Sequence, residues 1–139
     1  MTALPWQAHC GRHAARWGVP GAPGTTGVVM AGITVRSFDD PDEVAEFEHG
    51  RAAGVGVADS VVWRSDLEPG WSWDADVKPY TDGLEACPMF HREYVLAGRV
   101  RYVMTDGTET IGRPGQFLYI EPGHRAFVEG TETCVLLDW

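Results

Sequence analysis

Apolar and polar residues alternate in short stretches along the second half of the chain. From Met89 onward, β-branched and aromatic residues recur at every second position, and glycine or proline turns separate these stretches. Alternation of this kind predicts half-buried strands, and turns about every 8–12 residues are typical of an antiparallel sandwich or barrel. The residues expected in the core are Val95, Leu96, Val100, Tyr102, Val103, Phe117, Tyr119, Ile120, Phe127, Val128, Val135 and Leu137.

The first thirty residues have a different pattern from the rest. They show no sustained period of a helix or a strand, and the run Pro20–Gly24 (PGAPG) opposes regular structure. We therefore expect residues 1–30 to be a disordered or loosely attached extension and residues 31–139 to form one barrel domain that begins near Met30. An arm that swaps onto a partner subunit is the alternative for the extension.

Three further segments are predicted between the extension and the alternating region. The stretch 40–43 (DPDE) combines a capping aspartate, a proline and a glutamate in the order of a helix start, which predicts a short helix to about Phe47. Residues 50–56 are rich in glycine and are expected to be a linker. Strands are predicted at 60–65 and, from the alternation in WSWDADV, at 71–77.

Charge and cysteine content limit the partners and the compartment. The chain has 20 acidic and 11 basic residues and a net charge of −9, which disfavours nucleic acid and anionic membranes as partners. No apolar run reaches the roughly 20 residues of a membrane helix, and the layout of a signal peptide is not found. Cys10, Cys87 and Cys134 are odd in number and far apart, so we expect a reducing compartment, with the cytoplasm as the default.

Two glycine-anchored segments resemble the paired motifs of the cupin family. Residues 94–100 (YVLAGRV) match the strand and turn that end the first motif, and residues 115–123 (GQFLYIEPG) match most of the second. The resemblance covers Ser60 to Trp139. It implies an all-β fold, a small cupin-type antiparallel barrel (double-stranded β-helix or jelly roll) with one short N-terminal helix and a central pocket.

The chain is also similar to a subgroup of small bacterial cupin-domain proteins of unassigned activity. The similarity lies in the segment 68–79 (EPGWSWDADVKP), in a cysteine and a histidine four positions apart, and in a Pro-Gly-His sequence at 122–124. This chain has Arg125 where those proteins carry aspartate, and Glu93 where they carry a small residue. Both differences change the charge near the expected mouth of the barrel.

The metal ligands of the usual cupin pattern are replaced in this chain. Counting back seven positions from Gly98 places His91 at the glutamate position of the first motif. Glu85 and Cys87 then occupy its two histidine positions, and Ala126 occupies the histidine position of the second motif. The usual set of three histidines and one glutamate is therefore absent. The nearest substitutes are Cys87, His91, Glu93 and His124.

The substitutes suit one divalent metal ion, with zinc, iron and manganese as the options. In the cupin register His91 and Glu93 point inward from one strand, and His124 approaches from the corner after the second motif. We expect His91 and His124 within about 5 Å of each other and the Cys87 thiol close enough to share an ion. Glu93 would be an oxygen ligand or a general base. The alternative is that the cysteine is a core residue, His91 a hydrogen-bonded barrel residue and His124 a turn residue.

Aromatic residues before the first motif are candidates for a ligand pocket. In a cupin this region reaches across the barrel mouth, so Trp71, Trp73 and Tyr80 could stack on an apolar or planar ligand. Closing the core or a dimer interface is the alternative. Asp74, Asp76 and Glu85 are expected on a solvated face.

Three function classes follow from these patterns. The first is a barrel that binds a small organic molecule, with or without a divalent metal. The second is a metal-dependent enzyme of dioxygenase or isomerase type with Glu93 as the catalytic residue. The third is a dimeric interaction module. Homodimerisation is expected because a barrel of short strands with exposed aromatic residues often buries one sheet against its own copy.

Overall fold

The computed structural model describes residues 28–30 and 32–139. The extension 1–30 lies outside the described residues except for its last three. Those three residues form strand β1 (Val28–Met30), which pairs antiparallel with β2 (Ile33–Val35). Loose attachment of the extension therefore stays a prediction.

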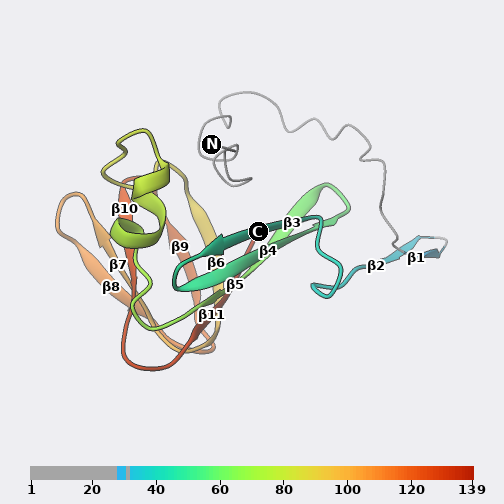
Figure 1. Cartoon of the computed structure of the whole chain (residues 1–139). Helices are drawn as coiled ribbons and strands as arrows, with labels where there is room; N and C mark the ends of the chain where they lie inside the picture. Colours follow the sequence, from blue (N-terminus) through green and yellow to red (C-terminus); the bar gives the residue numbers. More distant parts are fainter. Residues whose placement is uncertain (1–27, 31) are drawn as a thin grey trace.

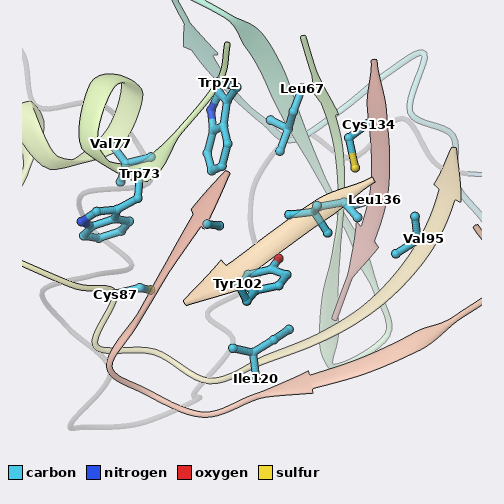
Figure 2. Close-up of a cluster of buried hydrophobic side chains, with 12 residues drawn as sticks. Leu67, Trp71, Trp73, Val77, Cys87, Val95, Tyr102, Ile120, Cys134 and Leu136 are labelled. Atoms are coloured by element: carbon cyan, nitrogen blue, oxygen red, sulfur yellow. The ribbon is translucent and has the colours of Figure 1, made fainter. Parts of the chain in front are cut away.

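Two antiparallel sheets make up the body of the protein (Figure 1). In spatial order the six-stranded sheet contains β3 (Glu43–Phe47), β4 (Gly50–Val57), β5 (Ser60–Leu67), β11 (Cys134–Asp138), β6 (His91–Ala97) and β9 (Phe117–Ile120). The three-stranded sheet contains β10 (His124–Val128), β7 (Val100–Met104) and β8 (Glu109–Gly112). Buried side chains from both sheets pack into one cluster (Figure 2). The predicted all-β architecture of antiparallel sheets is confirmed.

The predicted core is correct for one side of each strand. Val95, Val100, Tyr102 and Ile120 are buried, as expected. The expected core residues Leu96, Phe117 and Tyr119 are instead 46%, 73% and 63% exposed, because they occupy the opposite parity of β6 and β9 and face outward. On β11 the buried residues are Cys134 and Leu136, whereas the expected core residues Val135 and Leu137 are only half-buried.

The helix predicted to end near Phe47 is wrong. Residues 43–47 form strand β3, which pairs with β4, so the expected linker 50–56 is a strand as well. The carboxylate of Asp42 accepts hydrogen bonds from Arg36 (2.9 Å) and from the backbone N–H of Gly56 (2.7 Å). Pairing of β3 with the following strand β4 therefore outweighs the local helix-start signal. The strand predicted at 60–65 is confirmed as part of β5.

The short helical segment lies instead at 73–80, where a strand was predicted. It consists of one π-helical turn, η1 (Trp73–Val77), followed by a 3-10 turn, η2 (Lys78–Tyr80). The Ser72 hydroxyl caps η1 by accepting from the N–H of Ala75 (3.1 Å). Asp76 is fully buried rather than solvated, because its carboxylate accepts from the N–H groups of His49 and Ser72, both at 3.0 Å. These contacts anchor η1 on the barrel. No helix among the described residues is both long and apolar enough to cross a membrane.

Gly98, at the end of the first cupin-like motif, is required by its backbone and its surroundings. Its φ is +66°, and a Cβ added there would lie 2.5 Å from the carbonyl oxygen of Thr133 and 2.6 Å from Cα of Cys134. A side chain would clash with backbone, so only glycine allows the turn from β6 to β7 at this close approach. This turn sets the register that points His91 and Glu93 inward.

Candidate metal centre

Cys87 and His124 are held side by side by backbone hydrogen bonds. The N–H of Cys87 donates to the carbonyl of His124 (2.8 Å), and the N–H of Gly123 donates to the carbonyl of Cys87 (2.7 Å). Both side chains are buried. The segment before β6 is thereby pinned to the start of β10, and the thiol and the imidazole project into the same space.

His91 joins this pair from the first position of β6. Its Nε2 lies 3.4 Å from Sγ of Cys87, and its ring centroid lies 5.1 Å from that of His124. One ligand atom from each of the three side chains can be chosen so that all lie within 4.8 Å of one another. The expected proximity of the three residues is confirmed.

Each histidine is oriented by a hydrogen bond from its Nδ1. The Nδ1–H of His91 donates to Oδ2 of Asp138 on β11 (2.6 Å). The Nδ1 of His124 lies 2.6 Å from the carbonyl oxygen of Glu121, which can only accept, so this nitrogen carries the proton. The Nε2 atom of each ring is left for the cluster. A carboxylate or carbonyl behind the ring is the usual support of a metal-binding histidine.

The thiol and imidazole of the cluster form a charged pair in the metal-free protein. Burial would raise the pKa of Cys87, but hydrogen bonds from His124 and His91 and the charge of His91 outweigh it and lower the pKa to about 6. Burial would lower the pKa of His91, but its contacts with Asp138 and Cys87 outweigh this and raise the pKa to about 11. The thiolate, the form that binds metals, is therefore available at neutral pH.

Glu93 lies next to the cluster and is buried. The Tyr102 hydroxyl donates to Oε2 of Glu93 at 2.5 Å. The pKa of Glu93 is raised to about 7, mainly because burial disfavours the charged carboxylate. The charge of His91 acts against this shift, and the charge of Asp138 adds to it. Glu93 also forms a second group with His91 and Asp138, again with ligand atoms within 4.8 Å of one another. It can thus hold or release a proton near neutral pH.

A cavity of about 620 Å³ opens beside the cluster. Trp71 and Trp73 line it, as expected, and Figure 2 shows both rings within the cluster of buried side chains. Tyr80 does not line it. This residue ends η2 and is 49% exposed.

Two residues that support the candidate metal ligands and Glu93 were not predicted from the sequence. Asp138 orients His91, and Tyr102 was expected only as a core residue although it donates to Glu93. The signal for Asp138 was an acidic residue in the otherwise apolar strand sequence CVLLD. Of the expected surface residues, Glu85 is exposed and pairs with Lys78, as anticipated.

Comparisons with known proteins support the fold. No family model matches the chain, and no curated protein matches it in sequence. Among solved structures, the chain is similar to the S161A mutant of Bacillus subtilis oxalate decarboxylase OxdC, with a TM-score of 0.52 and 19% identity over 74% of this chain and 28% of that one. It is also similar to iron(II) HppE, with a TM-score of 0.55 and 13% identity over 81% of this chain and 62% of that one.

These neighbours are cupin-fold proteins, so the chain has the cupin fold. The chain spans less than two thirds of either neighbour's length. The identities are low, and the likeness therefore extends to the fold and not to an activity.

Proposed function

We propose that this protein holds one divalent metal ion through Cys87, His91 and His124 and binds a small organic molecule in the adjoining cavity. The observation that carries the proposal is the convergence of the three ligand atoms within 4.8 Å, with the outer nitrogen of each histidine already hydrogen-bonded. A bound ion would supply an open coordination position for a donor atom of the organic molecule.

The residues fit such an ion. Two ligands of a tetrahedral zinc ion, with bonds of about 2.0–2.3 Å, lie roughly 3.5 Å apart. The Sγ of Cys87 and Nε2 of His91 are separated by 3.4 Å. One thiolate and two imidazoles favour zinc or iron over manganese, which prefers oxygen ligands. The alternative role of the cysteine as an inert core residue does not explain why two imidazole nitrogens face its sulfur.

Metal analysis of protein purified without chelator or nickel resin tests this proposal. We expect about one ion per chain, as for a site with three protein ligands. His91→Ala should lose the ion, whereas Arg101→Ala should keep it, because Arg101 bonds to Glu129 and Glu109 away from the cluster. A wild-type protein that is metal-free and takes up no Zn²⁺, Fe²⁺ or Mn²⁺ would contradict the proposal.

A metal-dependent enzyme is the second candidate, favoured by the position of Glu93. This carboxylate lines the cavity beside His91, within reach of a molecule bound there, and the hydrogen bond from Tyr102 fixes its position. Incubating metal-loaded protein with a metabolite extract, followed by mass spectrometry, tests it. Turnover requires that a compound is consumed by the wild type and not by Glu93→Gln. Depletion of a compound by binding alone would be equal for both proteins.

A homodimer is also part of the proposal. The outward-facing Leu96, Phe117 and Tyr119 support it, because β9 is the edge strand of the six-stranded sheet and carries exposed aromatic rings. Sedimentation at micromolar concentration should give about twice the monomer mass, and a monomer would rule out both the dimer and the interaction-module alternative. The free thiols of Cys87 and Cys134 support a reducing compartment such as the cytoplasm.

A further inference from the structure

The wall of the cavity is formed mainly by apolar side chains. Seven phenylalanine, tryptophan and tyrosine rings line it from different parts of the fold: Phe47 on β3, Trp63 on β5, Trp71 before η1, Trp73 at its start, Phe90 before β6, Tyr102 on β7 and Trp139 after β11. Trp71, Trp73 and Tyr102 are more than nine-tenths buried. Flat aromatic walls of this kind contact planar or apolar ligands over a large area.

The charged groups along the cavity are mostly acidic. Glu93 and Asp138 lie beside the metal cluster, and Asp59 lies at the exposed end of the cavity. Arg92 is the only lysine or arginine among the lining residues that the structure describes. It is exposed, and its guanidinium carbon lies 5.2 Å from the centroid of the Phe90 ring.

Apart from the proposed metal ion and His91, the interior of the described cavity has no cationic group that could pair with an anionic ligand along the aromatic wall. Arg92 alternates outward between two inward residues of β6, and His91 is already paired with Asp138. A carboxylate placed against the aromatic wall would be desolvated without a lysine or arginine to pair with it and would face Glu93 and Asp138. The unpartnered indole N–H groups of Trp71 and Trp73 are donors there, but they carry no charge. Burying an unpaired charge is strongly unfavourable.

We propose that the cavity selects an uncharged molecule with a flat apolar body and a single neutral donor atom that reaches the metal, and that it discriminates against carboxylates. This inference rests on the proposed metal site for the position of the donor atom. The preference of the cavity for an uncharged, apolar ligand body rests on the residues of the cavity wall and does not depend on the metal.

Three probes with the same donor group test the inference by calorimetric titration of the zinc-loaded full chain at pH 8. They are imidazole, 4-phenylimidazole and imidazole-4-acetate. We expect 4-phenylimidazole to bind at least tenfold more tightly than imidazole, because the phenyl ring is buried against the wall. Imidazole-4-acetate should bind no more tightly than imidazole. An equal or tighter affinity for imidazole-4-acetate than for 4-phenylimidazole would overturn the inference.

A pair of variants ties the selectivity to the wall. Trp71→Leu should reduce the advantage of 4-phenylimidazole several-fold, whereas Tyr119→Leu should preserve it, because Tyr119 is exposed and outside the cavity. Where Trp71→Leu does not fold by circular dichroism, Met89→Ala at the half-buried lining residue replaces it. If the folded variant of the cavity wall binds 4-phenylimidazole with the same advantage over imidazole as the wild type, the inference is overturned.

The outcomes separate the inference from the metal proposal. If zinc binds but the phenyl ring adds less than tenfold, the ligand class is wrong and the metal site stands. If no zinc binds, the metal proposal fails, and titration of the metal-free chain with benzyl alcohol and with benzoate then tests the wall alone. Tighter binding of benzyl alcohol supports the uncharged ligand, and tighter binding of benzoate overturns it.

Discussion

Replacing Asp138 tests whether the cluster is built to hold a metal. Oδ2 of Asp138 accepts from Nδ1 of His91 at 2.6 Å, and both side chains are about three-quarters buried. This is a charge-assisted hydrogen bond that fixes the ring and increases the basicity of Nε2. Removing such an outer partner typically costs 10–100-fold in metal affinity, which is about 1.4–2.7 kcal/mol.

The size of the loss should depend on what replaces the aspartate. Asp138→Asn keeps an oxygen acceptor for His91 and removes only the charge, so we expect about a tenfold weaker zinc affinity. Asp138→Ala removes the acceptor as well and leaves the ring free to turn, so the loss should approach 100-fold. Competition with a chromophoric chelator measures both affinities directly.

The matched control is Asp66→Asn. Asp66 forms an ion pair with Arg64 on β5 and does not line the cavity. Zinc affinity should change less than about twofold in this variant, because exposed ion pairs contribute little. The reasoning is refuted if Asp138→Ala binds zinc as tightly as the wild type, or if the control loses as much affinity as Asp138→Asn.

Three further predictions concern stability. Gly98→Ala should lower the free energy of unfolding in urea by at least about 2 kcal/mol. The loss should be clearly larger than for Gly107→Ala, because both glycines have a positive φ but an added Cβ would clash only at Gly98. Equal losses in the two variants would refute the clash. In metal-free protein, burial raises the pKa of Glu93 from 4.5 to about 7, so its ionised form destabilises the fold, a cost that is complete above pH 7 and absent below about 4.5. Glu93→Gln should therefore raise the midpoint of thermal unfolding relative to the wild type at pH 8 and lose that advantage towards pH 4.5, and a pH-independent difference would contradict this. A chain that begins at Met30 should unfold within a few degrees of the full chain; a larger drop, on the order of 1–2 kcal/mol, would show that the preceding residues pack on the barrel.

The barrel was predictable because its information is local. Alternation marks each strand, and the glycine-anchored turns set the register in which Val95 and Tyr102 face inward. Alternation alone does not show whether the odd or the even positions of a strand face the core. Because β9 has apolar residues on both faces, Phe117 and Tyr119 were wrongly assigned to the core.

The two misassigned segments have a common cause. Asp42 has the position of a helix cap but bonds to Gly56 across a strand pair, and Asp76 lies in an alternating stretch but bonds to His49, which is 27 residues away. Both carboxylates use partners that are distant in sequence. Local patterns cannot reveal such pairing, and here it decides the secondary structure.

The site was predictable to the same extent. Cys87, His91, Glu93 and His124 follow from the register of the cupin-like motifs, since they fall on inward positions. Asp138 does not follow, because it is 47 residues from His91 and meets it only through the pairing of β11 with β6. The prediction for Tyr80 failed: the residue is absent from the cavity lining, and it follows the helical turn η1 that replaces most of the strand predicted at 71–77.

X-ray absorption at the zinc edge, on the zinc-loaded full chain, tests the central claim most directly. A metal held by Cys87, His91 and His124 predicts one sulfur scatterer at about 2.3 Å and two imidazole nitrogens at about 2.0–2.1 Å. The sulfur contribution should disappear in Cys87→Ser and persist in Cys134→Ser. A first shell of oxygen and nitrogen alone in the wild type, or a sulfur signal that survives Cys87→Ser, would contradict the account.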